Sequence, residues 1–234
     1  MNNLNNYQIA TDTSKGENLI DNSVSSHIGV SVYFKDIEEK LLSHIAEADA
    51  VFGAVAWLTS YSILESLSKL SNTSIIIQKE DFLRPDIGVS NNWKKELRTK
   101  YSNLSCDLTR YSFPNILSSM SVASDPSIEP IRCVGNHNKD KKSAFPRMHN
   151  KFLVFAKVAH TNDEHELETI EPYAVWTGSF NFTKNATNSL ENALYIIEPS
   201  IVKGYFDEYG QIAAMSEPLD WTSDWAEPEW RIGT

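Results

Sequence analysis

The stretch RMHNKFLVFA, residues 147–156, decides how the rest of the sequence is interpreted. Its apolar second half is typical of a buried β-strand, in which successive side chains point to opposite faces of a sheet. His149 and Lys151 therefore share one face, and that face continues with apolar side chains. A potentially cationic pair is costly on an apolar face. We therefore expect the pair at the mouth of the strand, opposite an anion.

Hydrophobic periodicity on both sides of this stretch predicts alternating strands and helices. Strands are expected over residues 28–34, 50–57, 74–79, 130–134, 147–156 and 173–178. Helices are expected over residues 35–49, 60–70, 91–101 and 199–215. This alternation is typical of an α/β domain. The segment between residues 104 and 130 has too weak a pattern to predict an element.

The length and composition are those of an ordinary globular protein. The 234 residues are 41% hydrophobic, and no apolar run approaches the roughly 20 residues of a membrane helix. The polar start lacks the apolar core of a signal peptide, so we expect a cytoplasmic protein without a membrane partner. A disulfide between the two cysteines is not expected in that compartment. We expect a loose arm over 1–26, one domain over 27–215 and a tryptophan-rich tail over 216–234.

Charge is unevenly distributed along the chain. The net charge of −10 argues against a protein that coats nucleic acid non-specifically. The segment from Arg132 to Lys151 has six basic residues and one acidic residue, so it carries +5 and the remainder carries −15. This segment would attract an anionic substrate, and a solvated basic loop is the alternative. The residues assigned to substrate steering are Lys139, Lys141, Lys142 and Arg147.

Polar groups follow in two further segments. Gly178 and Ser179 indicate a tight turn after a strand, where backbone amides can approach a phosphate. Asn181 adds an amide, and Glu191 begins the next apolar segment. Lysine and asparagine can stabilise phosphate oxygens, histidine can attack phosphorus, and a carboxylate can fix the histidine tautomer. These residue types are those of phosphoryl-group chemistry.

The combination of HNK, GSFN and NSLEN resembles the signature of the phospholipase D superfamily, H-x-K-x4-D followed by G-S-x-N and an acidic residue. The likeness is greatest to the single-motif bacterial nucleases of that superfamily, and it covers the segment from about Pro130 to Tyr205. The resemblance implies a phospholipase D-like α/β fold, with a mixed central β-sheet flanked by helices on both faces. The earlier strand–helix pairs resemble the superfamily more loosely.

The resemblance also implies a role for each motif residue. His149 would be the nucleophile, or the acid in the cycle of a partner subunit, and Glu191 would orient it. Lys151 and Asn181 would bind the substrate phosphate, and Ser179 would hydrogen-bond the phosphate or His149. One departure is clear, because the Asp of the motif is replaced by Ala156.

These residues predict a metal-independent phosphodiesterase, an endonuclease that cleaves nucleic acid through a phosphohistidine intermediate. Two histidines are needed and the chain has one H-x-K strand, so a homodimer with a shared site is expected, with Phe180 and Phe182 candidates for its interface. We expect either low sequence preference or an additional protein partner that supplies it. A phospholipid-cleaving hydrolase is the alternative enzyme, and a catalytically degenerate binding subunit is the alternative that Ala156 favours.

No cofactor or metal is expected. His137, His160 and His165 lie in polar segments, and no second pair of ligands has convincing zinc-site spacing. The acidic segment from Lys157 to Pro172 is interpreted as a solvated loop that joins two strands. The terminal tryptophans are interpreted as core or interface residues, and stacking on nucleobases is the less favoured alternative.

Overall fold

The computed structural model describes residues 7–8, 17–18, 20–80, 83, 92–108, 111–112, 121–122, 129–136, 146–160 and 168–219. The helices are α1 (Ile37–Glu47), α2 (Tyr61–Leu67), α3 (Asn92–Ser102) and α4 (Pro199–Ala214), with a short 3-10 helix over Lys184–Asn188. The longer strands are β4 (Val30–Tyr33), β5 (Ala50–Val55), β6 (Asn72–Gln78), β9 (Ile131–Val134), β10 (Lys151–His160), β11 (Glu168–Gly178) and β12 (Ala193–Ile196). The two-residue strands are β1 (Tyr7–Gln8), β2 (Glu17–Asn18), β3 (Val24–Ser25), β7 (Tyr111–Ser112), β8 (Ser121–Val122) and β13 (Glu217–Pro218).

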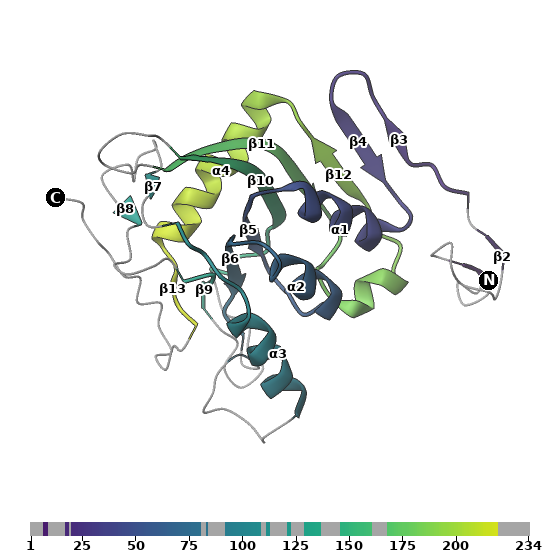
Figure 1. Ribbon diagram of the computed structural model, residues 1–234. Coiled ribbons are helices and arrows are strands. Elements are labelled where there is room, and N and C mark those ends of the chain that lie inside the picture. The colour runs from purple at the N-terminus through teal and green to yellow at the C-terminus, as the bar shows by residue number, and fades with distance from the viewer. Residues whose placement is uncertain are drawn as a thin grey trace.

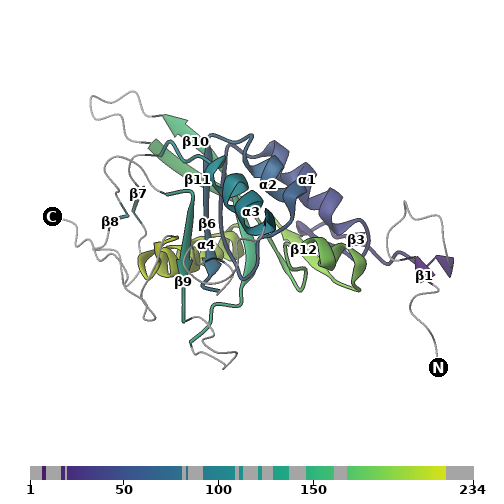
Figure 2. The same cartoon turned by 90° about the horizontal axis from the view of Figure 1, so that it is seen from below.

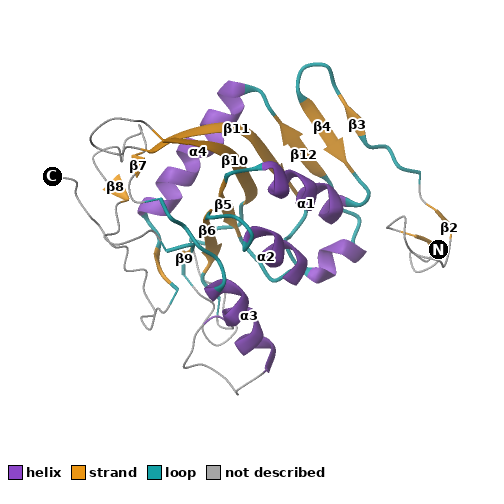
Figure 3. Cartoon of the chain, in the orientation of Figure 1, coloured by secondary structure: helices purple, strands orange, loops and turns teal. Residues whose placement is uncertain are grey.

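A mixed central sheet organises the described part of the chain (Figure 1). Its nine strands run in the order β13-β9-β6-β5-β10-β11-β12-β4-β3. Strands β5, β6 and β9 are parallel to one another. Strand β10 is antiparallel to β5, and the strands from β10 through β11 and β12 to β4 alternate in direction. The orange strands of Figure 3 form this layer between the helices.

Helices cover both faces of the sheet, which confirms the predicted α/β class. Helices α1, α2 and α3 pack on one face, where Leu41, Leu64 and Leu97 join the same apolar cluster. Helix α4 packs on the other face, where Val202 and Tyr209 join a second cluster. Figure 2 shows α4 on the opposite side of the strands from the other three helices.

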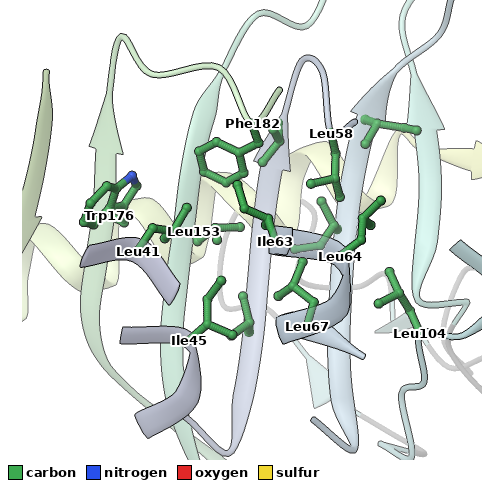
Figure 4. Packing of buried hydrophobic residues seen from close by; sticks show 14 of the residues in the cluster. Leu41, Ile45, Leu58, Ile63, Leu64, Leu67, Leu104, Leu153, Trp176 and Phe182 are labelled. Atoms are coloured by element: carbon green, nitrogen blue, oxygen red, sulfur yellow. The ribbon is translucent and has the colours of Figure 1, made fainter. Parts of the chain in front are cut away.

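Strand β10 lies in the middle of both clusters. Its side chains alternate as predicted: Leu153 and Phe155 join the cluster under α1 and α2, and Phe152 and Val154 join the cluster under α4. Figure 4 shows Leu153 beside Leu41 of α1 and Ile63 of α2. Burying apolar area on both faces is the main stabilising contribution to such a layered fold.

Gly53 lets β5 and β10 approach closely. A Cβ atom at Gly53 would lie 2.5 Å from a methyl group of Leu153 and 2.6 Å from the carbonyl oxygen of Phe152. Real Cβ atoms do not tolerate such distances, so a side chain here would push the two strands apart. The glycine therefore fixes the pairing in which Lys151 lies opposite Val55.

Local signals explain where two helices begin. Helix α4 has a proline in its first turn, and the carboxylate of Glu198 accepts a hydrogen bond from the Ile201 N–H at 2.9 Å. Helix α1 has Glu38 and Glu39 in its first turn, where negative charge is favourable. Both helices match their predicted ranges within a few residues.

The acidic segment from Lys157 to Pro172 differs from the predicted solvated loop. Its two ends continue β10 and β11 as an antiparallel ribbon, in which Lys157 pairs with Glu171 and His160 pairs with Glu168. Val158 and Ile170 of this ribbon pack against the α4-side cluster. The strands therefore extend beyond the sheet because their outer ends still have an apolar contact.

The sheet includes strands on both sides of the predicted 27–215 domain. Strand β3 pairs with β4, and β13 pairs with β9. Both added strands are two residues long. The three-part division of the chain stays a prediction, since most of the proposed arm and tail lies outside the described residues. Within the described residues, no helix is both long and apolar enough to cross a membrane.

Candidate active site

Sheet topology brings the predicted site residues to one edge. Strand β10 begins at this edge, where Lys151 lies opposite Val55 near the end of β5. Strand β11 ends at the same edge, and its last residue, Gly178, pairs with Ala193 at the start of β12. Ser179 follows β11 and Glu191 precedes β12, so both lie beside the start of β10.

His149 and Lys151 lie together at the mouth of β10, as predicted. The strand begins at Lys151, so His149 lies just before it and is exposed. The Lys151 ammonium donates a hydrogen bond to the carbonyl oxygen of His149 at 3.0 Å and lies 3.4 Å from each ring nitrogen. This contact holds the two side chains on the same side of the strand.

Trp57, which follows β5, contacts both of them. The His149 ring lies edge-on to the Trp57 ring, with 5.4 Å between the centroids, and the Lys151 nitrogen lies 5.8 Å from the Trp57 centroid. The indole N–H of Trp57 donates to a carboxylate oxygen of Glu80 at 3.1 Å. Trp57 is therefore fixed on one side and forms a wall for His149 on the other.

The electrostatic environment keeps His149 neutral to lower pH than usual. His149 is exposed overall, but part of its ring is removed from water. This desolvation, followed by the positive charges of Lys151 and Arg147, lowers the pKa of the His149 imidazole from its ordinary value. Burial also lowers the pKa of Lys151, and the negative charge of Glu191 opposes that shift. A neutral imidazole has the free nitrogen lone pair that a nucleophile needs.

Ser179 links the β11 turn to Glu191. Its hydroxyl donates to a carboxylate oxygen of Glu191 and accepts a hydrogen bond from the Asn192 N–H at 3.0 Å. A Cβ atom at the preceding Gly178 would lie 2.3 Å from the carbonyl oxygen of Asn192, so only glycine fits here. The sequence prediction gave Ser179 a phosphate or histidine partner; the structure gives it this carboxylate partner.

Glu191 contacts the site differently from the prediction. Among the described residues it makes no hydrogen bond to His149, and its electrostatic influence falls on Lys151. Its carboxylate instead accepts the Ser179 hydroxyl. In this structure Glu191 therefore supports the lysine and the turn directly.

Asn181 lies two residues after Ser179 and carries an amide oxygen that can accept a hydrogen bond. Its amide oxygen is buried and has no hydrogen-bond partner among the described residues. Asn181 also lines a cavity of about 440 Å³ together with Trp57 and Glu191. A buried polar atom without a partner is costly.

The two phenylalanines beside Asn181 correct one prediction. Phe180 and Phe182 were candidates for the dimer interface, but they are 1% and 0% exposed and belong to the apolar cluster under α1 and α2. The carbonyl oxygen of Phe182 accepts hydrogen bonds from the N–H groups of Thr59 and Ser60, at 2.8 and 2.9 Å. These contacts tie the loop to the segment after β5 and bury its aromatic side chains.

Arg147 has a fixed partner instead of a free guanidinium. It forms an ion pair with Glu80, the same carboxylate that accepts the Trp57 indole N–H. Arg147 therefore helps to fix Glu80 and, through it, Trp57, and its role in steering substrate stays a prediction. The other three predicted steering residues, Lys139, Lys141 and Lys142, lie outside the described residues.

Ala156 lies far from the site. It is fully buried in the cluster on the α4 side and pairs with Ala50. Ala156 lies five residue steps along the strand from Lys151, which corresponds to roughly 16 Å. The replacement of the motif aspartate therefore falls in the packing under α4, away from the edge where His149 and Lys151 lie.

Trp57 and Glu80 are the two residues of this edge that the sequence prediction missed. Trp57 ends the predicted strand over 50–57 and Glu80 follows the strand over 74–79, so the signal was their place after buried parallel strands. Within the described residues, no group of three His, Cys, Asp or Glu side chains lies close enough to hold a metal ion.

Comparisons with known proteins identify similar structures and a similar sequence. No protein-family model matches the sequence. The chain is similar in structure to a phospholipase D family member, Nuc from Salmonella typhimurium, at 17% identity and a TM-score of 0.47 over 80% of this chain and 95% of that one. It is also similar to NucT from Helicobacter pylori, at 14% identity and a TM-score of 0.46 over 80% of this chain and 96% of that one.

A sequence relative is found in a virus. The uncharacterized protein L381 of Acanthamoeba polyphaga mimivirus is 32% identical over 204 residues, which span 82% of this chain and 67% of the viral protein. The aligned region therefore covers most of both chains. This chain belongs to the same protein family as mimivirus protein L381.

Proposed function

We propose that this chain is a phospholipase D-like phosphodiesterase that cleaves nucleic acid without a metal ion. The observation that carries the proposal is the meeting of the H-x-K pair, the G-S-x-N turn and Glu191 at one sheet edge. Three separate segments supply a nucleophile, a cation and hydrogen-bonding groups at this edge, where a packing role in the core does not account for such polar side chains.

His149 acts as the nucleophile in this proposal. One ring nitrogen forms a bond to phosphorus while the bond from phosphorus to the leaving oxygen breaks. The lowered pKa of His149 supports this role, because the imidazole stays unprotonated at neutral pH. Water then attacks the phosphohistidine, releases a phosphate monoester and restores the imidazole.

Lys151 stabilises the phosphate oxygens as negative charge develops on them. Partial burial supports this role, since a charge is worth more to its partner where water is partly excluded. Asn181 offers its amide to the same phosphate, and Ser179 with Glu191 holds the turn and the lysine in place.

A homodimer completes the proposed site. The leaving oxygen needs a proton, and a second histidine would supply it. Among the described residues no other histidine lies near His149: His44 is stacked on Tyr195 in the interior, with 3.7 Å between ring centroids. A two-fold axis beside β10 would bring the same residue of a second copy to the phosphate.

Labelled DNA and RNA incubated with excess chelator test the proposal. Cleavage is expected to continue in chelator and to be lost in His149→Ala. The matched control is His27→Ala, because His27 is exposed in a turn that is remote in sequence from the motif. Activity that disappears in chelator and returns with magnesium would contradict the metal-independent mechanism.

Light scattering and subunit mixing test the shared site. The wild-type protein is expected to be a dimer at working concentration. In exchanged mixtures of wild-type and His149→Ala chains, activity is expected to fall below the wild-type fraction. A fully active monomer would refute the dimeric site and leave the phosphodiesterase proposal standing.

A further inference from the structure

Two adjoining cavities lead away from the candidate active site toward α3. The first has a volume of about 440 Å³ and is lined by Trp57, Asn181, Glu191 and Trp93, among others. The second has a volume of about 740 Å³. Both are lined by Thr59, Trp93, Thr183 and Asn185, so they form one continuous depression, called here the Trp93 groove. Each volume falls in the range of small-molecule sites.

The Trp93 groove begins where the proposed chemistry takes place. Trp57 lines the groove and also contacts His149 and Lys151. Glu191 lines it as well and influences the charge of Lys151. A phosphate held by the H-x-K pair would therefore have its neighbouring sugar and base at the mouth of the groove.

The aromatic lining suits a flat partner. Trp93, near the start of α3, is 38% exposed, which is high for a tryptophan. Trp57 also lines the groove, at the end where its ring contacts His149 and Lys151. Indole faces stack on nucleobases with little sequence preference, since every base has a π-face.

The polar lining offers both hydrogen-bond donors and acceptors to the edge of a base. The buried amide oxygen of Asn181 has no partner among the described residues. Glu38, Glu96 and Lys184 line the far part of the groove. Carboxylates accept hydrogen bonds from amino and hydroxyl groups, and an ammonium donates hydrogen bonds to ring nitrogens and carbonyl groups.

We propose that the Trp93 groove binds one unpaired nucleobase next to the phosphate that is cleaved. This inference rests on the proposed phosphodiesterase function and deepens it. A base inside a duplex is stacked on both sides and cannot enter such a groove without being flipped out. The substrate is therefore single-stranded or locally unpaired nucleic acid.

Trp93→Ala is the variant that tests the groove. Loss of one base–aromatic stack is expected to lower kcat/KM on a single-stranded oligonucleotide by roughly 5- to 100-fold. Trp93→Phe is expected to retain most of that activity, because it keeps an aromatic face. The matched control is Ile201→Ala, which removes another large apolar side chain, 41% exposed, from α4 on the opposite face of the sheet. Circular dichroism checks that each variant is folded.

Three further substrates separate the base from the phosphate. The wild-type enzyme is expected to prefer the single-stranded oligonucleotide over the same sequence as a duplex, and over a strand whose bases are replaced by abasic sites. Methyl 4-nitrophenyl phosphate reports the chemistry alone, so Trp93→Ala is expected to lose much less on it. Equal cleavage of single strand, duplex and abasic strand would overturn the inference.

Binding to the His149→Ala protein keeps the inference testable if no phosphodiester is cleaved at all. A fluorescent single-stranded oligonucleotide is expected to bind more tightly than its duplex, and Trp93→Ala in the same background is expected to weaken binding by a similar factor. Absence of cleavage with this binding pattern would reject the proposed function and retain the groove. Binding that is indifferent to Trp93 would reject the groove.

Discussion

Lys79 and Lys151 lie at the same end of the two strands that flank β5, and they illustrate two uses of a lysine. Lys79 follows β6 and Lys151 begins β10, and both strands flank β5. Lys79 is 0% exposed and forms an ion pair with Glu217 of β13. Lys151 is only partly buried and makes no ion pair with a carboxylate among the described residues, although Glu191 is near enough to influence its pKa.

The difference shows what a partner from the same chain does to a buried charge. The ion pair of Lys79 joins the edge strand β13 to the sheet, so that lysine stabilises the fold. Lys151 is partly removed from water. The nearby Glu191 carboxylate accepts a hydrogen bond from Ser179 and forms no ion pair with Lys151. The ammonium of Lys151 can therefore bind an anion such as a substrate phosphate. A buried lysine that has a fixed ion-pair partner indicates a structural role. A partly buried lysine without an ion-pair partner indicates a binding site.

Breaking the Lys79–Glu217 pair is expected to have the largest effect, on stability. Lys79→Met would leave the Glu217 carboxylate buried without its cation, and removing one member of a buried pair costs about 3–5 kcal/mol. Chemical denaturation followed by circular dichroism measures this loss in the free energy of unfolding. The double variant Lys79→Met with Glu217→Met is expected to recover much of it. An unchanged free energy of unfolding in the single variant would show that the pair has no structural role.

Lys151→Met is expected to have the opposite signature. The loss of one cation that faces the phosphate is expected to lower kcat/KM by about 100- to 1000-fold. The free energy of unfolding should change by about 1 kcal/mol or less, because no buried partner is left alone. Turnover of methyl 4-nitrophenyl phosphate and a denaturation curve give both numbers. If Lys151→Met lowered the free energy of unfolding and retained normal turnover, the role of Lys151 would be structural and not catalytic.

The contrast between these lysines also explains how much the sequence alone predicted. Alternation placed Leu153 and Phe155 of β10 on one face and predicted His149 and Lys151 at its mouth, because a core excludes unpaired charge. The sequence does not distinguish Lys79 from an exposed lysine at a strand end. Its partner, Glu217, lies in the predicted tail and reaches it only through the pairing of β13 with β9.

The site prediction failed where contacts depend on strand register. Trp57 meets His149 because Val55 lies opposite Lys151, a pairing that no local motif encodes. Phe180 and Phe182 were expected at an interface because they flank the motif. They are buried because the Phe182 backbone accepts hydrogen bonds from Thr59 and Ser60, which draws the turn onto the core.

Glu191→Gln tests the carboxylate whose charge influences the pKa of Lys151. The change removes the negative charge beside Lys151 and weakens the hydrogen bond from Ser179, and a hydrogen bond to a charged group contributes about 1.5–3 kcal/mol. Activity is therefore expected to fall roughly 10- to 100-fold. Ser179→Ala is the matched variant, since it removes the same hydrogen bond and keeps the charge. Normal turnover in Glu191→Gln would show that the carboxylate has no part in the site.

The pKa of His149 is the finest measure of how Lys151 is used, and the smallest effect expected. In the wild-type protein, burial and the positive charges of Lys151 and Arg147 lower this pKa, because both disfavour the imidazolium form. Removing the positive charge in Lys151→Met relieves one of these causes, so the pKa of His149 is expected to rise toward its ordinary value. Titration of the imidazole signals by NMR measures the shift without relying on activity.

Lys203→Met is the control for that titration. Lys203 lies on α4 and pairs with Asp207, on the face of the sheet opposite α1 and α2. Its removal changes the net charge by the same amount and is expected to leave the His149 pKa where it was, because a distant exposed charge is screened. An equal rise in both variants would mean that His149 responds to the net charge of the protein. A rise in Lys151→Met alone would mean that Lys151 itself keeps the imidazole neutral, as a histidine nucleophile requires.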